Sequence, residues 1–355
     1  MIPMPVTIKQ IAQQAQVSHG AVSAVLNDRR NSIRVSEQTR ERILKIAEEL
    51  GYRRNSLAAG LRGGKTQSIG LIWPFEDVAA GDASIGMQIL RGLQAQDYAT
   101  IHADHLTNIH QVIQTIDDMA ARRVDALVIH SFARFLRSPE IVKRLNNMDN
   151  VLVVCQQLIP ELEKADQLVH DRVPGIQQVA DYLYASGRKK PGIGLCMHEP
   201  DNHHKYHAFR DRWLELGGED HPNLLLDFGL TNQTRDQKVW ASLKRIFKGT
   251  CPVDAIFAIN DMNAMYAAHF LKNEMGMKVP DDVAIVGMNN IEVGLIWDPP
   301  LASISRNREQ LTQVAQKMLL DRIAKPHMSP RHESVPMQFV WRQSAGPELK
   351  PQTPK

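Results

Sequence analysis

The feature of this chain that most constrains its fold is a long alternation of short apolar segments with amphipathic ones, beginning at Gln67. Each apolar segment has the length of a buried strand, and each amphipathic segment repeats its apolar residues at helical spacing. Strands connected by helices in this way form a parallel sheet with helices on both faces. The first series of segments is QSIGLIWP, IGMQILRGLQAQD, YATIHAD, VIQTIDDMAARR, VDALVIHS and, after IVKRLNNM, VLVVCQQ.

A second series with the same alternation runs from VPGIQQVADYLYASG to VAIVGMNN, so we expect an α/β core of two doubly wound parallel-sheet lobes. Such sheets bind ligands at the carboxyl ends of their strands, and two lobes place these ends across one cleft. We expect the core at residues 67–345, and a Pro-rich, polar tail at 346–355 that is disordered. The expected first lobe comprises about 67–165 and 295–325, and the second about 166–294 and 326–345.

Residues 6–51 carry the pattern of a three-helix head that contains a helix-turn-helix. Thr7 precedes a first helix, Ser18 is a suitable N-cap for a second helix, HGAVSAVLN, and a third helix begins at Ser36. Helical spacing predicts that the second helix faces inward with Val22, Val25 and Leu26, and outward with His19, Gly20, Ser23, Ala24 and Asn27. The same spacing predicts that the third faces inward with Ile43, Leu44, Ala47 and Leu50.

Positive charge is concentrated near the amino terminus. Residues 1–65 hold eleven Lys and Arg against five Asp and Glu, whereas the whole chain has a formal net charge of +3, which leaves −3 for the remainder. A basic head on a slightly acidic body favours a polyanion as partner of the head alone. Together with the helix-turn-helix pattern, this predicts double-stranded DNA as that partner; the alternative is a small helical bundle that packs on another protein surface.

Residues 52–66 connect the head to the core and include NSLAAGLRGG, a segment of helical pattern that is too short to be stable alone in water. Gly60 weakens such a helix by a further ~1 kcal/mol relative to Ala. We therefore expect a hinge segment whose helix forms only with a partner.

The sequences VTIKQIAQQAQVSHGAVSAVLN and VSEQTRERILKIAEELGYRRNSLAAGL closely resemble the DNA-binding head and hinge of the lactose-repressor and purine-repressor family of bacterial transcription regulators. The resemblance implies that Leu61 inserts as a wedge into the minor groove. It implies phosphate contacts from Thr7, Ser36, Thr39 and Tyr52, and Asn55 at the start of the hinge helix. The other implied DNA-contacting residues are Ser18, His19, Gly20, Ala21, Ser23, Asn27 and Ala58.

The head departs from the family pattern at two places. Ala24 and Gly20 replace longer side chains of many relatives, so His19 and Ser23 are the best candidates for direct base readout. The connection DRRNSIR is longer than in several relatives, and its arginines Arg29, Arg30 and Arg34 either bind the DNA backbone or groove edges or belong to a solvated loop.

The core resembles that of the same family, which has the fold of periplasmic sugar-binding proteins, most clearly in VDAIFAINDMNAMYAAHFLKNEMGMKVPDDVAIVGMNNIEVGLIWDPPLASISRN. The resemblance implies a homodimeric repressor whose operator affinity is controlled by a small molecule bound between the lobes. The implied effector-binding residues are Trp73, His130, Cys155, Lys205, Asn260, Asp261 and Asn289.

Two of these positions bear on the effector's chemistry. Asn289 stands where sugar-binding relatives have an aspartate, and Lys205 where they have an arginine. A cleft with fewer carboxylates and a retained cation favours a sugar acid or sugar phosphate. The alternatives are a neutral ligand with Lys205 paired to an acid, or a regulator without a small-molecule effector.

Other classes of protein find little support. Nucleotide-binding and hydrolase motifs are missing, which argues against an enzyme, and we expect no cofactor. The histidines of HEPDNHHKYH lack zinc-site spacing, so we expect no metal, and the separated Cys155, Cys196 and Cys251 are typical of reduced, buried thiols. A solute-binding protein would need a signal peptide and would lack the head. With no transmembrane segment either, we expect a cytoplasmic protein associated with the bacterial nucleoid.

Overall fold

The computed structural model describes residues 6–26, 35–52, 65–74, 82–104, 108–131, 133–195, 200–228, 235–249 and 252–349. The chain divides into two compact units, the head, Met1–Gln67, and the body, Ser68–Lys355.

The head contains helices α1 (Ile8–Gln14), α2 (His19–Leu26) and α3 (Glu37–Glu49), as expected from the cap residues. Thr7 caps α1 in a capping box with Gln10, and Ser36 caps α3 by accepting the Thr39 N–H. The three helices pack around a small apolar core of Ile11, Ala12, Ala15, Val22, Val25, Ile43 and Ala47.

Two side chains of the head differ from the expectation. Ala24 is buried, at 6 % exposure, although we expected it to face outward. Leu44 is 45 % exposed, although we expected it to face inward. Each lies at the border of the apolar side of its helix, where helical spacing alone does not decide the direction.

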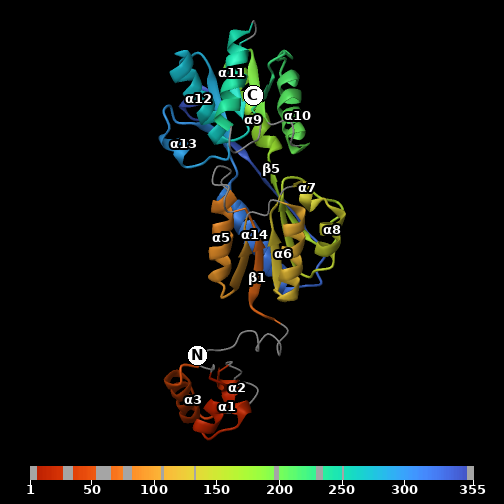
Figure 1. The fold of residues 1–355 in the computed structure, drawn as a ribbon, viewed down its shortest axis with the longest axis vertical. Helices are drawn as coiled ribbons and strands as arrows, with labels where there is room; N and C mark the ends of the chain where they lie inside the picture. The colour runs from red at the N-terminus through yellow and green to blue at the C-terminus, as the bar shows by residue number, and fades with distance from the viewer. Residues whose placement is uncertain are drawn as a thin grey trace, which may run out of the picture. The chain divides into compact units, whose positions relative to one another are not determined.

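The body is an α/β structure with two six-stranded sheets, which confirms the expected class. The first sheet has the order β11-β5-β4-β3-β1-β2 and is parallel throughout. Helices α5 and α14 cover one face, and α6, α7 and α8 the other (Figure 1). The strands are β1 (Ser68–Ile72), β2 (Ala99–Ala103), β3 (Ala126–Ile129), β4 (Val151–Cys155), β5 (Asp166–Asp171) and β11 (His332–Pro336); the helices are α5 (Asp82–Gln94), α6 (Ile109–Ala121), α7 (Ala133–Leu136), α8 (Pro139–Asn146) and α14 (Arg308–Ala324).

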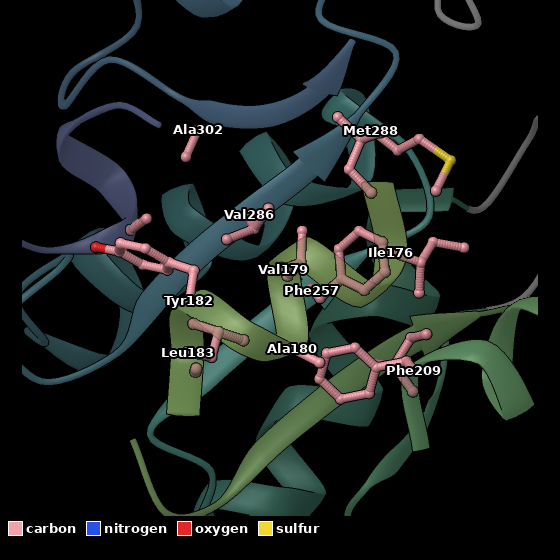
Figure 2. Packing of buried hydrophobic residues seen from close by; sticks show 14 of the residues in the cluster. Ile176, Val179, Ala180, Tyr182, Leu183, Phe209, Phe257, Val286, Met288 and Ala302 are labelled. Atoms are coloured by element: carbon pink, nitrogen blue, oxygen red, sulfur yellow. The ribbon is translucent and has the colours of Figure 1, made fainter. Parts of the chain in front are cut away.

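The second sheet has the order β12-β10-β9-β8-β6-β7, with β12 antiparallel to β10 and the other pairs parallel. Figure 2 shows Ile176, Val179 and Leu183 packed with Phe257 and Val286 in the core between the sheet and α9. Helices α9 and α10 cover this face, and α11 and α12 the other. The strands are β6 (Pro191–Leu195), β7 (Leu225–Asp227), β8 (Ala255–Ala258), β9 (Ala284–Met288), β10 (Ala302–Ser305) and β12 (Gln338–Val340); the helices are α9 (Val173–Ala185), α10 (Pro200–Glu215), α11 (Arg235–Lys248), α12 (Asp261–Met275) and α13 (Val293–Ile296).

We call each sheet with its helices a lobe, and the two lobes differ from our expected boundaries. Strand β5 and strand β11 pair with each other in the first sheet, although we expected residues 166–171 and 332–336 in the second lobe. Strand β10 pairs with β9 in the second sheet, although we expected it in the first lobe. The alternation of strands and helices along the sequence is the same in both lobes, so it does not reveal which sheet a strand joins.

The lobes are connected by three crossovers, each of one or two residues. Arg172 separates β5 from α9, Arg306 and Asn307 separate β10 from α14, and Met337 separates β11 from β12. The Met337 N–H donates to the Asp171 carbonyl at 2.7 Å, and a Cβ added at Gly175 would lie 2.6 Å from Ile304 Cγ2. The crossovers are therefore packed together, and they join the carboxyl ends of the parallel strands of both sheets.

We expected a disordered tail from residue 346 onward, but the first residues of this segment are bonded to the second lobe. The Trp341 indole donates to the Gly346 carbonyl at 3.2 Å, and the Tyr182 hydroxyl to the Pro347 carbonyl at 2.8 Å. These bonds attach residues 346 and 347 to the second lobe. In the described ranges, no helix is both long and apolar enough to span a membrane.

Candidate functional site

The start of α2 is the part of the head with the features of a DNA-reading surface. The Ser18 hydroxyl accepts the Ala21 N–H at 3.2 Å, and Ser18 and His19 are exposed. Gly20, Ala21 and Ser23 are half-buried, whereas Val22 and Val25 are buried and anchor the helix. The first turn of α2 therefore exposes the His19 imidazole beside the small residues Gly20 and Ala21, on a helix whose opposite side is fixed.

The residues expected near phosphates lie close to helix ends. Thr7 and Ser36 cap α1 and α3, and the Ser36 and Thr39 hydroxyls lie 2.9 Å apart. Unbonded N–H groups give helix amino termini a partial positive charge that favours phosphate oxygens. Tyr52 is half-buried and packs against the head's apolar core. Asn27, Arg34, Asn55, Ala58 and Leu61, together with Arg29, Arg30 and Gly60, lie outside the described residues.

Three expected effector residues lie at the carboxyl edge of the first sheet. Trp73 follows β1, His130 follows β3 and Cys155 ends β4, and all three are buried. The ring centroids of Trp73 and His130 are 4.8 Å apart. Sequence reasoning missed His170 of β5, whose ring meets that of His130 edge-on at 5.5 Å. Its position near the carboxyl end of a strand is the same signal that identified the others.

Two side chains of this edge carry protons that the structure locates. The His130 Nδ1 lies 2.8 Å from the Val154 carbonyl oxygen, which can only accept, so Nδ1 carries the proton. Burial raises the pKa of the Cys155 thiol to about 12, so it remains protonated at neutral pH. A protonated thiol is a poor nucleophile and a poor metal ligand.

The remaining expected effector residues lie in the second lobe and have defined partners there. Asn260 caps α12, where its Oδ1 accepts the Asn263 N–H at 2.8 Å. The Asp261 carboxylate is buried and accepts the Ser303 hydroxyl at 2.6 Å and the Ile291 N–H at 2.8 Å. Burial raises the pKa of Asp261 to about 6, against the lowering by these hydrogen bonds and by Arg342 and Arg308.

Asn289 follows β9 and begins a loop with unusual backbone angles. Asn289 and Asn290 have φ values of 106° and 51°, in the left-handed region that asparagine tolerates better than most residues. Their carbonyl oxygens accept the same Arg308 guanidinium at 3.1 and 2.8 Å. Arg308 begins α14 of the first lobe, so this loop of the second lobe is bonded across the crossovers.

Three buried basic side chains of the body donate to carboxamide oxygens. Lys205 Nζ donates to Asn202 Oδ1 at 2.8 Å. Arg306 Nε donates to Asn289 Oδ1 at 3.0 Å, and Arg172 donates to Gln156. Sequence reasoning missed Arg172 and Arg306, although each directly follows a largely buried strand, β5 and β10.

In the part of the chain that the structure describes, no three His, Cys, Asp or Glu side chains are grouped so that they could hold a metal ion. His203, His204 and His207 lie on α10 with exposed side chains, and His198 lies outside the described residues.

Two family models match the chain. Residues 7–55 match the model of bacterial regulatory proteins of the lacI family. Residues 66–343 match the model of periplasmic binding proteins and the sugar-binding domain of the LacI family.

Curated relatives share this layout over nearly their whole length. The HTH-type transcriptional repressor CytR of Escherichia coli K12 is 26 % identical over 332 residues, 91 % of each chain. The HTH-type transcriptional repressor PurR of Aliivibrio salmonicida is 24 % identical, over 95 % of this chain and 98 % of its own. The probable HTH-type transcriptional repressor ExuR of Bacillus subtilis 168 is 25 % identical, over 90 % and 92 %.

Solved structures show the same fold. The lac repressor dimer bound to operator and the anti-inducer ONPF superposes with a TM-score of 0.79 at 18 % identity, over 96 % of this chain and 99 % of that one. A complex of the transcriptional regulator CelR with cellobiose gives a TM-score of 0.65 at 22 % identity, over 96 % and 99 %.

Proposed function

Because the chain belongs to the lacI family of bacterial regulatory proteins, we propose that α2 reads an operator in the major groove and that a small molecule bound between the lobes controls this binding. One observation carries the proposal: a head with an exposed, capped α2 precedes a body whose two sheets meet at their carboxyl edges through short crossovers. Movement of one lobe against the other would then alter the segment that joins the body to the head.

We assign direct base readout to His19 and Ser23, and phosphate contacts to Thr7, Ser36, Thr39 and Tyr52. A dimer would place two α2 helices in successive major grooves of a near-palindromic operator. The lac repressor binds its operator as a dimer, and for this chain we propose the same assembly. Leu61 and the hinge segment would lie in the minor groove between the two heads. CytR, PurR and ExuR are named repressors, and for this chain we propose repression without catalysis, in the cytoplasm.

The test of DNA binding is a selection of sequences from a random duplex library by the full-length protein, followed by fluorescence anisotropy. His19→Ala and Ser23→Ala should each weaken binding to the selected site by ~5–150-fold, with much less effect on unrelated DNA. Gln13→Ala is the matched control, because Gln13 is exposed on α1 rather than α2. Failure to enrich any sequence would contradict the proposal.

For the small molecule we propose a sugar that carries a carboxylate or phosphate. The support is the presence of three buried basic side chains, Lys205, Arg172 and Arg306, two of which belong to the crossovers between the lobes. Positive charge buried in the crossovers favours an anionic group on a ligand bound between the lobes.

The effector test is a thermal-shift series with D-glucose, D-glucuronate and D-glucose 6-phosphate, followed by operator binding with each compound. A ligand at about 100 times its Kd should add ~2.7 kcal/mol to the free energy of unfolding. Lys205→Gln should reduce the shift from the anionic compounds, whereas Lys248→Gln, at an exposed position of α11, should not. If no sugar or sugar acid changes melting temperature or DNA affinity, the alternative of a regulator without a small-molecule effector is favoured. A solute-binding protein remains a weaker alternative, because it would not need the head.

A further inference from the structure

Asp261 is surrounded by groups that hold the loop after β9. One carboxylate oxygen accepts the Ser303 hydroxyl at 2.6 Å, and the other accepts the Ile291 N–H at 2.8 Å. The Ser303 hydroxyl oxygen in turn accepts the Asn290 N–H at 3.0 Å. Two consecutive backbone N–H groups of the loop are thus fixed, one directly and one through Ser303, by a single carboxylate.

The backbone around Asp261 is arranged to admit this carboxylate. A Cβ added at Gly287 of β9 would lie only 2.1 Å from Asp261 Oδ1, so only glycine leaves room there. The charged groups that face Asp261 are Arg342, after β12, and Arg308, at the start of α14. An arginine can only donate, so neither can accept from the loop N–H groups as Asp261 does. Arg342 donates to the Leu301 carbonyl and to Asn290 Oδ1. Arg308 donates to the carbonyls of Asn289 and Asn290.

The loop held in this way connects the second lobe to the crossovers. Its Asn289 side chain accepts Arg306 of the crossover between β10 and α14. Its two carbonyls accept Arg308 of the first lobe. The backbone positions of Asn289 and Asn290 therefore determine where both arginines find their acceptors.

We propose that Asp261 is a positioning residue rather than an effector contact: its carboxylate fixes the loop from Asn289 to Ile291 in the arrangement that binds Arg306 and Arg308 and receives the small molecule. The proposal rests on the proposed function for its ligand, but the loop itself can be tested without one. The ionised carboxylate accepts charge-assisted hydrogen bonds from both the Ser303 hydroxyl and the Ile291 N–H. A carboxamide or a protonated carboxyl group would have to donate to the Ser303 hydroxyl, which reverses that bond and leaves only weaker neutral hydrogen bonds to hold the loop.

Burial supports a functional reason for this side chain. The pKa of Asp261 is raised to about 6, chiefly by loss of hydration. At neutral pH the folded protein therefore buries an ionised carboxylate, which lowers the free energy of unfolding. Titratable groups with pKa values shifted in this way are common at functional sites. Protonation below about pH 6 should resemble the Asp261→Asn substitution, since both turn one accepting oxygen into a donor.

The first experiment is hydrogen exchange, followed by mass spectrometry, on the full-length protein without ligand. At pH 7.5, Asp261→Asn should accelerate exchange of the Asn290 and Ile291 amides by about tenfold, the equivalent of one lost hydrogen bond. Ile285 and Val286 of β9 should keep their protection. Asp281→Asn, an exposed acid that precedes the same strand, is the matched control and should match wild type.

A pH series separates positioning from a general packing role. After correction for intrinsic exchange, the wild-type loop should lose protection as pH falls from 7 to 5, and Asp261→Asn should show the same low protection throughout. Ser303→Ala should affect Asn290 more than Ile291, because Ser303 bridges only to Asn290. Wild-type protection in Asp261→Asn, or a loop unaffected by pH, would overturn the proposal.

The second experiment is calorimetric titration with D-glucose 6-phosphate and with D-glucuronate. We expect Asp261→Asn to weaken binding at least tenfold at pH 7.5, with Asp281→Asn unchanged. Lost binding together with unchanged exchange would make Asp261 a direct ligand contact and overturn the positioning role. If neither compound binds the wild type, the proposed effector class and the ligand-receiving role of the loop both fail, while the exchange data still decide whether Asp261 positions it.

Discussion

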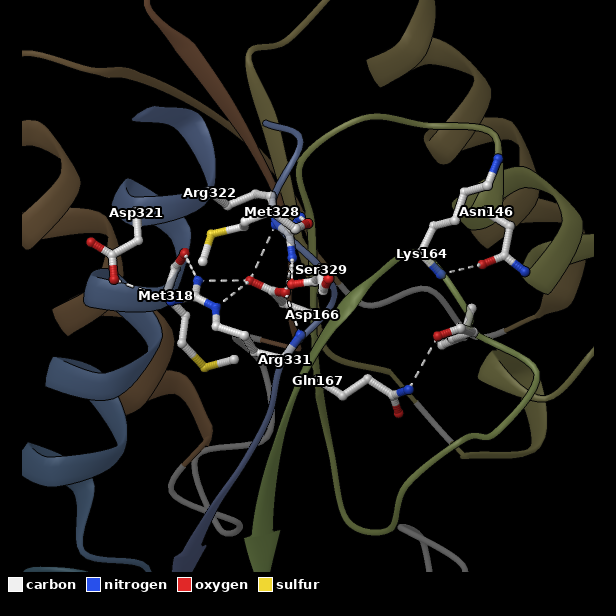
Figure 3. Close-up of polar contacts among 11 residues, drawn as sticks. Asn146, Lys164, Asp166, Gln167, Met318, Asp321, Arg322, Met328, Ser329 and Arg331 are labelled. Atoms are coloured by element: carbon white, nitrogen blue, oxygen red, sulfur yellow. Dashed lines mark hydrogen bonds and ion pairs between the residues drawn. The ribbon is translucent and has the colours of Figure 1, made fainter. Parts of the chain in front are cut away.

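The stability of the first lobe depends on a buried carboxylate at the far end of the sheet from the crossovers. Asp166 begins β5, is 1 % exposed and binds both Arg322 and Arg331. Figure 3 shows both guanidinium groups directed at this carboxylate, one from α14 and one from the segment before β11. Arg331 also donates its backbone N–H to Asp166 at 2.9 Å, so the cluster ties α14 and β11 to β5.

We predict that Asp166→Ala lowers the free energy of unfolding by about 3 kcal/mol. Removing one partner of a buried ion pair typically costs ~3–5 kcal/mol, because the other charge remains buried without it. The lower end applies, because Arg322 still donates to the Met328 and Ser329 carbonyls and Arg331 to Asp321. A loss of this size corresponds to a fall in melting temperature of about 6–12 °C.

The measurement is urea unfolding followed by circular dichroism, with thermal melts alongside. Asp117→Ala is the control, because its ion pair with Arg144 is solvent-accessible, with the two side chains 54 % and 33 % exposed. Such a pair should contribute less than ~1 kcal/mol. Equal losses for Asp166→Ala and Asp117→Ala would refute the reasoning, since burial would then not determine the cost.

Three further predictions concern the crossovers, pH and DNA. Gly175→Ala should destabilise the body by ~1–3 kcal/mol and alter the response of DNA binding to ligand, because its Cβ would lie 2.6 Å from Ile304 Cγ2 and 3.1 Å from the Met337 carbonyl oxygen; unchanged denaturation and ligand response would contradict this. The pKa of Asp261 is higher in the folded protein, about 6, than its ordinary 3.8, so the folded state binds the proton more tightly. Its contribution to unfolding free energy should therefore decline by ~2 kcal/mol as pH rises from 4 to 6, and the difference between wild-type and Asp261→Asn denaturation across that range should reveal it. Leu61→Ala should reduce operator affinity in anisotropy well beyond any change in melting temperature, and equal affinity would exclude the wedge role.

Local signals in the sequence were sufficient to predict the head. Thr7, Ser18 and Ser36 mark helix starts through hydrogen bonds within three residues, so a reader of the sequence needs no tertiary information to find them. Ala24 and Leu44 were predicted wrongly because their directions depend on how three helices pack, not on either helix alone. The family resemblance, first seen in these same segments, is confirmed by the family models.

The body was predictable in its class but not in its connections. Burial of whole strands such as β4 follows from their continuous apolar sequence. The lobe of β5, β10 and β11 depends instead on pairing partners distant in sequence, which no local pattern encodes. For the same reason, Trp73, His130 and Cys155 could be placed at strand ends, whereas the bonds from Arg306 and Arg308 to the Asn289 loop could not be foreseen.

The number of crossovers has a consequence for measurement. A chain that passes between two bodies an odd number of times must begin in one and finish in the other: β1 lies in the first lobe and β12 in the second. The DNA-binding segment is thus covalently linked to the first lobe only, and any group fused after residue 349 travels with the second. A donor fluorophore introduced in α5 and an acceptor fused at that end would consequently lie on different lobes. Energy transfer between them would then report movement of one lobe relative to the other, without any change inside either sheet.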